Sequence, residues 1–142
     1  MQKLLIFASE QWLLITLLFL VLFFIARIEK KKAGIILSSN DLTRLMNKED
    51  TLLIDLREKS DFSEGHIVGA ISLPFQQWQA KNNKNDYLLS QCTDKSIALV
   101  CKMGQQSSFV AKSLSKESGD KKIYRLGGGV MEWKASQMPL VK

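Results

Sequence analysis

One apolar stretch near the N-terminus constrains this chain more than any other feature. Every residue from 12 to 26 is apolar except Thr16. The hydrocarbon core of a bilayer, about 30 Å thick, needs roughly 20 helical residues to cross it, and residues 7–28 meet that length. Because the stretch has no polar face, a helix lying on a membrane surface or packed in a globular core fits less well. We therefore expect residues 7–28 to form one transmembrane helix.

The charges that flank this stretch predict its orientation. Arg27 and the lysines at 30–32 follow it, whereas Lys3 is the only basic side chain before it. Basic residues favour the cytoplasmic side of a membrane. We therefore expect residues 1–6 to lie outside as a short N-terminus, residues 29–34 to form a basic linker, and residues 35–142 to lie in the cytoplasm. A cleaved signal peptide fits less well, because it would have a basic start and a shorter apolar core.

The rest of the chain is long enough for one domain. The protein has 142 residues and a net charge of +6, and residues 35–142 suffice for a single compact core. No basic stripe with interleaved aromatic residues is present, so a nucleic-acid partner is not expected. The two cysteines, Cys92 and Cys101, are too few for a disulfide framework. A bridge between them is the less favoured alternative to two free thiols in a reducing compartment.

Apolar runs of strand length alternate with helical segments along residues 35–142. Ser38 with Asp41 three residues later resembles a capping box, and Ser60 is expected to cap a turn that Gly65 ends. Continuously apolar strands joined by helices predict an α/β fold with a mostly parallel central sheet flanked by helices. The strands are expected at 35–37, 51–55, 70–73, 96–100 and 123–126, and the helices at 38–50, 60–64, in parts of 75–95, at 107–118 and at 130–136.

Cys101 lies where such a fold places its ligand sites, since ligands of parallel sheets bind beyond the carboxyl ends of the strands. A loop at this point can direct several backbone N–H groups and the positive end of the following helix at the sulfur, which favours a reactive thiolate. The alternative is an unreactive cysteine that simply ends a buried strand. The residues that follow this cysteine are Lys102, Met103, Gly104, Gln105, Gln106 and Ser107, the last of which begins the expected helix.

Three segments resemble the rhodanese family. ALVCKMGQQSS is similar to the family's active-site loop, LIDLREKSDFSEGHIVGAISLP to its signature around Gly-His-Ile-x-Gly-Ala, and YRLGGGVMEW to its closing Leu-x-Gly-Gly and Trp motif. They occur in the family's order and spacing, and they cover about residues 35–140. One such domain behind one N-terminal helix also resembles membrane-anchored, single-domain rhodanese-like proteins of Gram-negative bacteria. This resemblance implies a single-pass protein of the bacterial inner membrane.

The resemblance to rhodaneses implies a sulfurtransferase. Cys101 is then the catalytic nucleophile, which attacks the outer sulfur of a donor such as thiosulfate and carries that sulfur as a persulfide. Residues 102–107 form the substrate-binding loop, and no metal or organic cofactor is required. The implied partners are a small sulfur donor, a thiol or protein that accepts the sulfur, and the lipid bilayer around residues 7–28, with room for a membrane-protein partner.

Two loop residues depart from the family pattern. Lys102 stands where Arg is usual, which keeps the charge but loses the bidentate fork, and Gln106 stands where a second Arg is common. The loop of six residues from Cys101 to Gln106 matches sulfur-transferring members and is one residue shorter than that of related phosphatases. We therefore expect weak binding of thiosulfate and a less anionic natural donor. The alternative function is a non-catalytic module that recruits a partner to the membrane or senses redox state.

Three further residues match the family signature and are expected to support the site. Asp55 is expected to hydrogen-bond the loop, and Arg57 to pair with a nearby carboxylate. His66, the only histidine, is expected to bind backbone and fix a turn rather than to act as a general base. A role for Cys92 in resolving a persulfide is the less favoured interpretation of that thiol. Trp133 is expected in the core.

Overall fold

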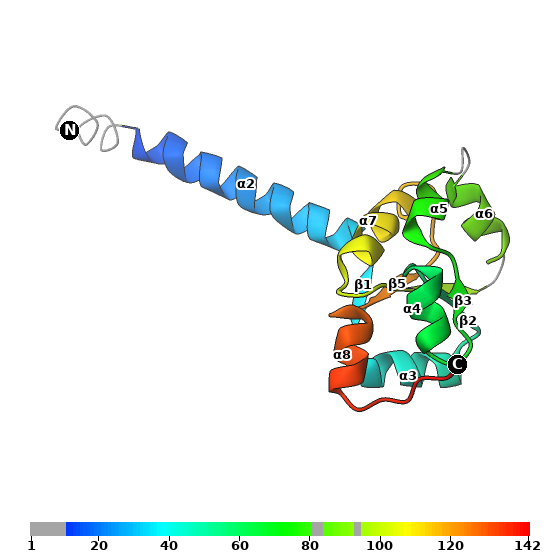
Figure 1. Cartoon of the computed structure of the whole chain (residues 1–142). Coiled ribbons are helices and arrows are strands. Elements are labelled where there is room, and N and C mark those ends of the chain that lie inside the picture. Colours follow the sequence, from blue (N-terminus) through cyan, green and yellow to red (C-terminus); the bar gives the residue numbers. More distant parts are fainter. Residues whose placement is uncertain (1–10, 81–83, 93–94) are drawn as a thin grey trace. The chain divides into compact units, whose positions relative to one another are not determined.

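The structure is a computed structural model that describes residues 11–80, 84–92 and 95–142, with the backbone alone at residues 29–32 and 84 (Figure 1). The chain divides into two compact units, residues 1–31 and residues 32–142. Helix α2 (Trp12–Lys32) makes up the described part of the first unit, and all the strands belong to the second. The fold that positions Cys101 is therefore that of the second unit.

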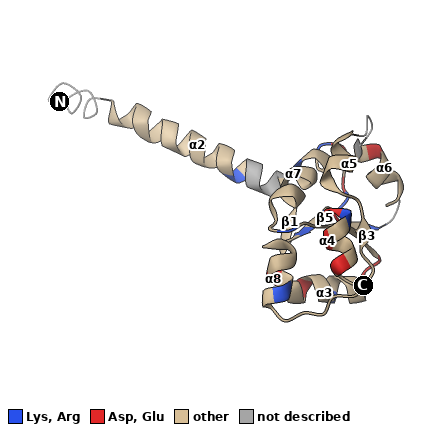
Figure 2. Cartoon of the chain, in the orientation of Figure 1, with Lys and Arg blue, Asp and Glu red and all other residues tan. Residues whose placement is uncertain are grey.

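Helix α2 carries its apolar side chains on the outside. Among residues 12–28 all the large apolar side chains except Ile15 are exposed, and Arg27 is the only charged residue (Figure 2). The span expected at residues 7–28 starts within residues 1–10, which lie outside the described part of the chain. None of the helices that are described is long and apolar enough to cross a bilayer. The helix extends to Lys32, so most of the expected linker has a helical backbone.

A five-stranded sheet forms the centre of the second unit. The strand order is β1-β5-β4-β2-β3, and every pair is parallel, which confirms the predicted sheet. All carboxyl ends therefore lie along one edge of the sheet, where binding sites of α/β folds form. The strands are β1 (Ile35–Leu37), β2 (Thr51–Asp55), β3 (Ile71–Ser72), β4 (Ser96–Val100) and β5 (Ile123–Leu126).

Helices cover both faces of this sheet (Figure 1). Helices α5 (Phe75–Ala80), α6 (Lys84–Ser90) and α7 (Gln105–Leu114) pack on one face, where they contribute to one core cluster. Helices α3 (Ser39–Lys48) and α8 (Gly129–Ala135) pack on the other face, in a second cluster. A short helix, α4 (Lys59–Glu64), has no buried residue.

Strand β4 explains why both faces are covered. Ile97 and Leu99 point into the first cluster, whereas Ala98 and Val100 point into the second. Successive side chains of a strand lie on opposite faces, so a strand without polar residues at these positions must be buried on both sides. Cys101 continues this alternation into the first cluster, and the strand thus aims its sulfur toward helix α7.

Some predicted helix boundaries hold and others do not. Ser38 caps helix α3, and its Oγ accepts a hydrogen bond from the N–H of Asp41 at 3.2 Å. The expected cap at Ser60 is wrong, because helix α4 begins one residue earlier at Lys59 and Ser60 lies inside it. Helix α7 begins at Gln105 rather than at residue 107, and strand β3 is shorter than the expected 70–73. Local propensity is a weak guide to such ends.

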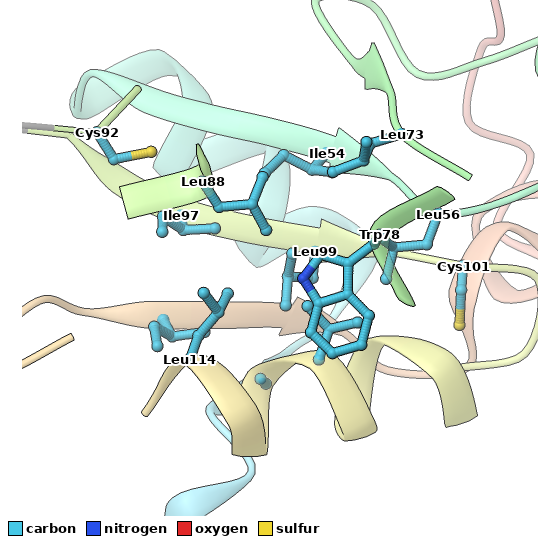
Figure 3. Close-up of a cluster of buried hydrophobic side chains, with 13 residues drawn as sticks. Ile54, Leu56, Leu73, Trp78, Leu88, Cys92, Ile97, Leu99, Cys101 and Leu114 are labelled. Atoms are coloured by element: carbon cyan, nitrogen blue, oxygen red, sulfur yellow. The ribbon is translucent and has the colours of Figure 1, made fainter. Parts of the chain in front are cut away.

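The two cysteines lie in the same core cluster but at opposite ends of it (Figure 3). Both are buried and both are free. Between them the cluster is filled by apolar side chains, among them Trp78, Leu88 and Leu99. A disulfide requires Cα atoms within about 7 Å, and the fold places these two residues on opposite sides of a packed core. The expectation of two free thiols is therefore confirmed.

Candidate active site

The sulfur of Cys101 accepts hydrogen bonds from the loop that follows it. Cys101 is the first residue after strand β4 and is 1% exposed. Its Sγ receives the backbone N–H of Gly104 at 3.0 Å and that of Ser107 at 3.5 Å. The thiol of Cys101 in turn donates to the hydroxyl oxygen of Ser107 at 3.6 Å. Donors that converge on a sulfur in this way stabilise a negative charge there.

Gly104 allows the loop to curl this tightly. Its φ of +93° lies in the left-handed region that side chains with a Cβ rarely adopt. The hydroxyl of Ser107 closes the curl by donating to the carbonyl of Gly104 at 3.0 Å. Gly104 is also the residue that precedes helix α7, so the first turn of that helix faces the sulfur. The positive end of the helix therefore adds to the field at Cys101.

Helix α8 holds the outer side of the same loop. The N–H of Val130 donates to the carbonyl of Cys101 at 2.9 Å, and that of Met131 donates to the carbonyl of Lys102 at 3.2 Å. In a trans peptide the carbonyl and the next N–H point in opposite directions. Holding these two carbonyls toward α8 therefore turns the following N–H groups toward the inside of the loop.

Gly129 makes this close approach possible. A Cβ at this position would lie 2.2 Å from the carbonyl oxygen of Cys101 and 2.6 Å from that of Lys102. Its φ of +63° also favours glycine. The sequence showed the glycines at 127–129 only as part of the motif YRLGGGVMEW, and it gave no sign of this contact, which joins segments far apart in the chain. The glycine run is the signal that could have suggested it, since glycines mark close approaches of two backbones.

A small pocket of about 160 Å³ opens above the cradled sulfur. Lys102 and Met103 are exposed, and Gln106 is partly exposed. The side of the site open to solvent thus carries one cation, one thioether and two amides over a floor of backbone donors. The residues that line the pocket are Cys101, Lys102, Met103, Gln105 and Gln106, all of them predicted from the sequence as site residues.

The family description "Rhodanese-like domain" matches residues 38–136, which span this sheet, its loop and helix α8. The chain belongs to the rhodanese-like family. Two similar proteins differ in what their names say. "Uncharacterized protein YibN" of Escherichia coli (strain K12) is 34% identical over 134 residues, 94% of this chain and 89% of its own length. "Thiosulfate sulfurtransferase GlpE" of Coxiella burnetii (strain RSA 331 / Henzerling II) is 33% identical over 91 residues, 64% of this chain and 78% of its own.

A solved structure shows the same rhodanese-like fold. The rhodanese-related protein from Thermoplasma volcanium superposes with a TM-score of 0.62 over 75% of this chain and 97% of its own. Its sequence identity of 23% makes this a likeness of fold. Together with the family match, it accounts for a parallel sheet whose central strand is followed directly by Cys101.

In this rhodanese-like domain Asp55 and Arg57, which were expected to support the site, bind each other. The carboxylate of Asp55 accepts from the Nε of Arg57 at 3.0 Å and from its Nη2 at 2.7 Å, and both residues are buried. Arg57 also donates to the carbonyls of Asp61 and Gly65. The predicted pairing of Arg57 with a carboxylate is confirmed. No hydrogen bond among the described residues joins Asp55 to the Cys101 loop, so the pair fixes the segment after strand β2 instead.

His66 is engaged by backbone and by a neighbouring ring. Its Nδ1 lies 3.0 Å from the carbonyl of Phe62, and the two rings stack with centroids 3.8 Å apart. Its own backbone exchanges two hydrogen bonds of 2.8 Å with Val141. These contacts agree with the expectation that His66 fixes a turn, and they tie the C-terminal residues to the end of helix α4.

Proposed function

We propose that this chain is a sulfurtransferase that carries sulfane sulfur as a persulfide on Cys101. The observation that carries the proposal is the sulfur's own environment. Cys101 Sγ accepts from two backbone N–H groups, those of Gly104 and Ser107, at the base of a pocket with room for a small donor. The similar protein named a thiosulfate sulfurtransferase supports the reaction class.

The reaction balances without an external oxidant or reductant. The thiolate of Cys101 attacks the outer sulfur of thiosulfate, a new S–S bond forms, and the donor's S–S bond breaks so that sulfite leaves with the electron pair. The persulfide keeps one negative charge on its outer sulfur. The thiolate of an acceptor then attacks that outer sulfur, takes it as its own persulfide and returns the thiolate of Cys101.

The loop supplies fixed donors for the charge at each stage. The backbone N–H groups of Gln105 and Gln106 have no acceptor among the described residues, as is usual for the first turn of a helix. Both residues line the pocket. Donors that are already in place cost no reorganisation when charge moves from the inner to the outer sulfur, which is how preorganised sites lower a barrier.

The natural donor is proposed to be less anionic than thiosulfate. Lys102 is the only charged residue that lines the pocket, and Gln106 places a neutral amide at the loop position expected to carry a second cation. A donor with a single negative charge, such as an organic persulfide, needs fewer cations than a dianion does. Gln106 is also the feature that favours the second candidate, a module that recruits a partner without transferring sulfur.

Mass spectrometry of the purified full-length chain tests the enzyme proposal. After incubation with thiosulfate or an organic persulfide, the protein should gain the mass of one sulfur atom, and cyanide or a reducing thiol should remove it. The Cys101→Ser variant should gain nothing, because a hydroxyl cannot hold a persulfide, whereas Cys92→Ser should behave as the native chain does. If neither donor modifies Cys101, the recruitment function replaces the enzyme.

We further propose that helix α2 attaches the domain to the bacterial inner membrane, with the domain on the cytoplasmic side. The apolar side chains of residues 12–28 are exposed, and exposed apolar surface of this extent needs a cover. On the N-terminal side of the helix the sequence has further apolar residues at 4–8. The similarity to YibN covers 94% of the chain. The basic residues after the helix favour the cytoplasmic side.

Two measurements test the attachment. The full-length chain should stay with the membrane fraction after washing at high pH, whereas a chain with Leu17, Leu20 and Phe24 all changed to Lys should be released. A C-terminal alkaline phosphatase fusion should be inactive, because that enzyme is active only in the periplasm. Release of the native chain by the wash contradicts attachment, and an active fusion contradicts the orientation.

A further inference from the structure

One charged residue lies in the middle of strand β5. Arg125 stands between Tyr124 and Leu126, which are both buried in the core cluster that contains Ala98 and Val100. Because neighbours in a strand point to opposite faces, Arg125 points to the other face. That face belongs to the cluster that contains Cys101, so the strand directs the guanidinium to the side of the sheet where the reactive sulfur lies.

The register places Arg125 within reach of that sulfur. Arg125 pairs with Leu99 of strand β4, and Cys101 is the next residue after Leu99 on the same face. Strands about 4.8 Å apart that rise about 3.3 Å per residue separate two such positions by about 8 Å. An extended arginine side chain spans most of that distance. Arg125 does not line the pocket, so its effect on Cys101 is exerted from outside the pocket lining.

Among the residues whose side chains are described, none hydrogen-bonds or ion-pairs with the guanidinium of Arg125. Its Nε is buried and makes no hydrogen bond, and none of the ion pairs among the described residues includes it. Burial lowers the pKa of Arg125, and a negative charge on Cys101 acts in the opposite direction and raises it. A half-buried cation without a partner costs folding free energy. A negative charge on the Cys101 side therefore makes the arrangement more favourable.

We propose that Arg125 is a positioning residue that stabilises the negative charge of the Cys101 thiolate, and of the persulfide formed there, from outside the pocket lining. The inference deepens the proposed function and rests on it. It also explains how the site can function although Gln106 is neutral. Lys102 lines the pocket and can contact an incoming donor, and Arg125 of strand β5 supplies the second cation. The positive charge of Arg125 then stabilises the thiolate and the persulfide of Cys101, rather than the leaving group of the donor.

Alkylation of the full-length chain tests the charge without requiring sulfur transfer. The rate at which iodoacetamide modifies Cys101 is followed from pH 5 to 10 by peptide mass spectrometry, so that Cys101 is measured separately from Cys92. In Arg125→Met the rate at pH 7 should fall by about fivefold, and the profile should move to higher pH, because the thiolate loses a nearby cation. Arg125→Lys should restore most of the rate, since it keeps the charge.

Matched controls separate charge from packing. Arg44 has a side chain that is 77% exposed and lies on helix α3, so Arg44→Gln removes one charge far from the loop and should leave the profile unchanged. The thermal midpoint of Arg125→Met should equal or exceed that of the native chain, because a half-buried cation without a partner among the described residues has been removed. Arg125→Gln provides a second charge-free variant if Met packs badly. A Lys variant as slow as the Met variant, or a Met variant with the native profile, overturns the inference.

The persulfide gives a second readout. When the chain is loaded with sulfur and the donor is removed, the adduct on Cys101 should decay faster in Arg125→Met than in the native chain, and at the native rate in Arg44→Gln.

The experiments distinguish failure of the sulfurtransferase proposal from failure of the role of Arg125. If Cys101 accepts no sulfur but Arg125→Met still slows alkylation, the sulfurtransferase proposal fails and the electrostatic role stands. If Cys101 accepts sulfur and neither readout changes, the role of Arg125 alone fails.

Discussion

The two cysteines of this chain share one core and yet differ in the groups that surround their sulfur atoms. Both belong to the same buried cluster, with 0% and 1% of their surfaces exposed (Figure 3). Burial raises the pKa of Cys92, against a smaller opposing effect of Lys121 and Lys95. The sulfur of Cys101 instead accepts two backbone N–H groups. Burial alone therefore disfavours the thiolate at Cys92, whereas the sulfur of Cys101 has the loop donors beside it.

The polarity of the parallel sheet explains this difference. Cys92 comes before strand β4, close after the end of helix α6, whereas Cys101 comes after the same strand and before helix α7. In an α/β fold the carboxyl edge of the sheet meets helix N-termini, and the amino edge meets helix C-termini. The helix end near Cys92 carries partial negative charge, which disfavours a thiolate. The amine of Lys121 donates to the carbonyl of Cys92 at 2.6 Å rather than to its sulfur.

The largest difference between the two cysteines should appear in their rates of alkylation. In the native full-length chain at pH 7.5, iodoacetamide should modify Cys101 at least about 100-fold faster than Cys92, because only one sulfur has both donors and an opening to solvent. Peptide mass spectrometry after timed quenching gives both rates. In denaturant the two rates should converge, which is the control. Comparable rates in the folded chain contradict the assignment of Cys101 as the reactive thiol.

A pair of glycines tests whether helix α8 holds the reactive loop in place. Gly129→Ala should lower the free energy of unfolding by about 3 kcal/mol, because it adds both left-handed strain and a clash with the carbonyl of Cys101. Gly119→Ala shares the positive φ but meets nothing within 4 Å, so it should cost about 1 kcal/mol. Chemical denaturation measures both changes.

The sulfur loading of the two glycine variants adds a functional readout. Displacement of the Cys101 loop by the new methyl group should reduce persulfide formation in Gly129→Ala under conditions where that variant remains folded. Gly119→Ala should load as the native chain does. Equal losses of stability in the two variants would show that backbone strain alone matters, and that the contact between Gly129 and the loop contributes nothing.

Much of the fold followed from apolar patterning because the strands are short and buried on both sides. The apolar runs at residues 51–55, 96–100 and 123–126 became strands with the expected bounds. The start of helix α7 was misplaced because the residue before it is Gly104, which caps the helix through its left-handed conformation and offers no side chain that the sequence could reveal. Ser60 shows the reverse error, since a capping residue type lies inside a helix.

Some residues of the candidate site could be predicted from the sequence and others could not. Residues contiguous with Cys101 could be identified from the sequence, because a strand followed by a loop and a helix brings them together locally. The contacts of Gly129 and the direction of Arg125 could not, because they depend on strand register and on a helix that is distant in the chain. Alternation along IYRL would have flagged Arg125 as a charged residue on a buried strand, but its nearness to Cys101 required the order of β5 and β4.

A positive charge added at the pocket should have a smaller effect, on the turnover of thiosulfate. Gln106→Arg should raise thiosulfate turnover several-fold, about the effect of one more favourable charge on a dianion near a protein surface. Gln91→Arg, at an exposed position close to Cys92 in the sequence, adds the same charge and should have no effect. Steady-state production of sulfite measures both. No gain in Gln106→Arg would show that the cation at this loop position does not limit the reaction with thiosulfate.

The titration of Cys92 should make a small contribution to the free energy of unfolding at alkaline pH. Its pKa is raised in the folded chain, chiefly by burial, whereas in the unfolded chain it should lie near the ordinary value of about 8.5. Below that pH both states hold the proton, so the stabilising contribution of the buried thiol is complete. As the pH rises further, the unfolded state loses its proton first, and the free energy of unfolding falls until the folded pKa is passed.

The control for this effect is a chain that cannot titrate at residue 92. Cys92→Ala should be somewhat less stable at every pH because it leaves a small cavity, so the comparison uses slopes rather than absolute values. Between pH 8 and 10.5 the free energy of unfolding, measured by urea titration, should fall more steeply in the native chain than in Cys92→Ala. Parallel curves would show that Cys92 titrates alike in both states. Burial would then not separate it from an ordinary thiol, and the contrast with Cys101 would depend on the loop donors alone.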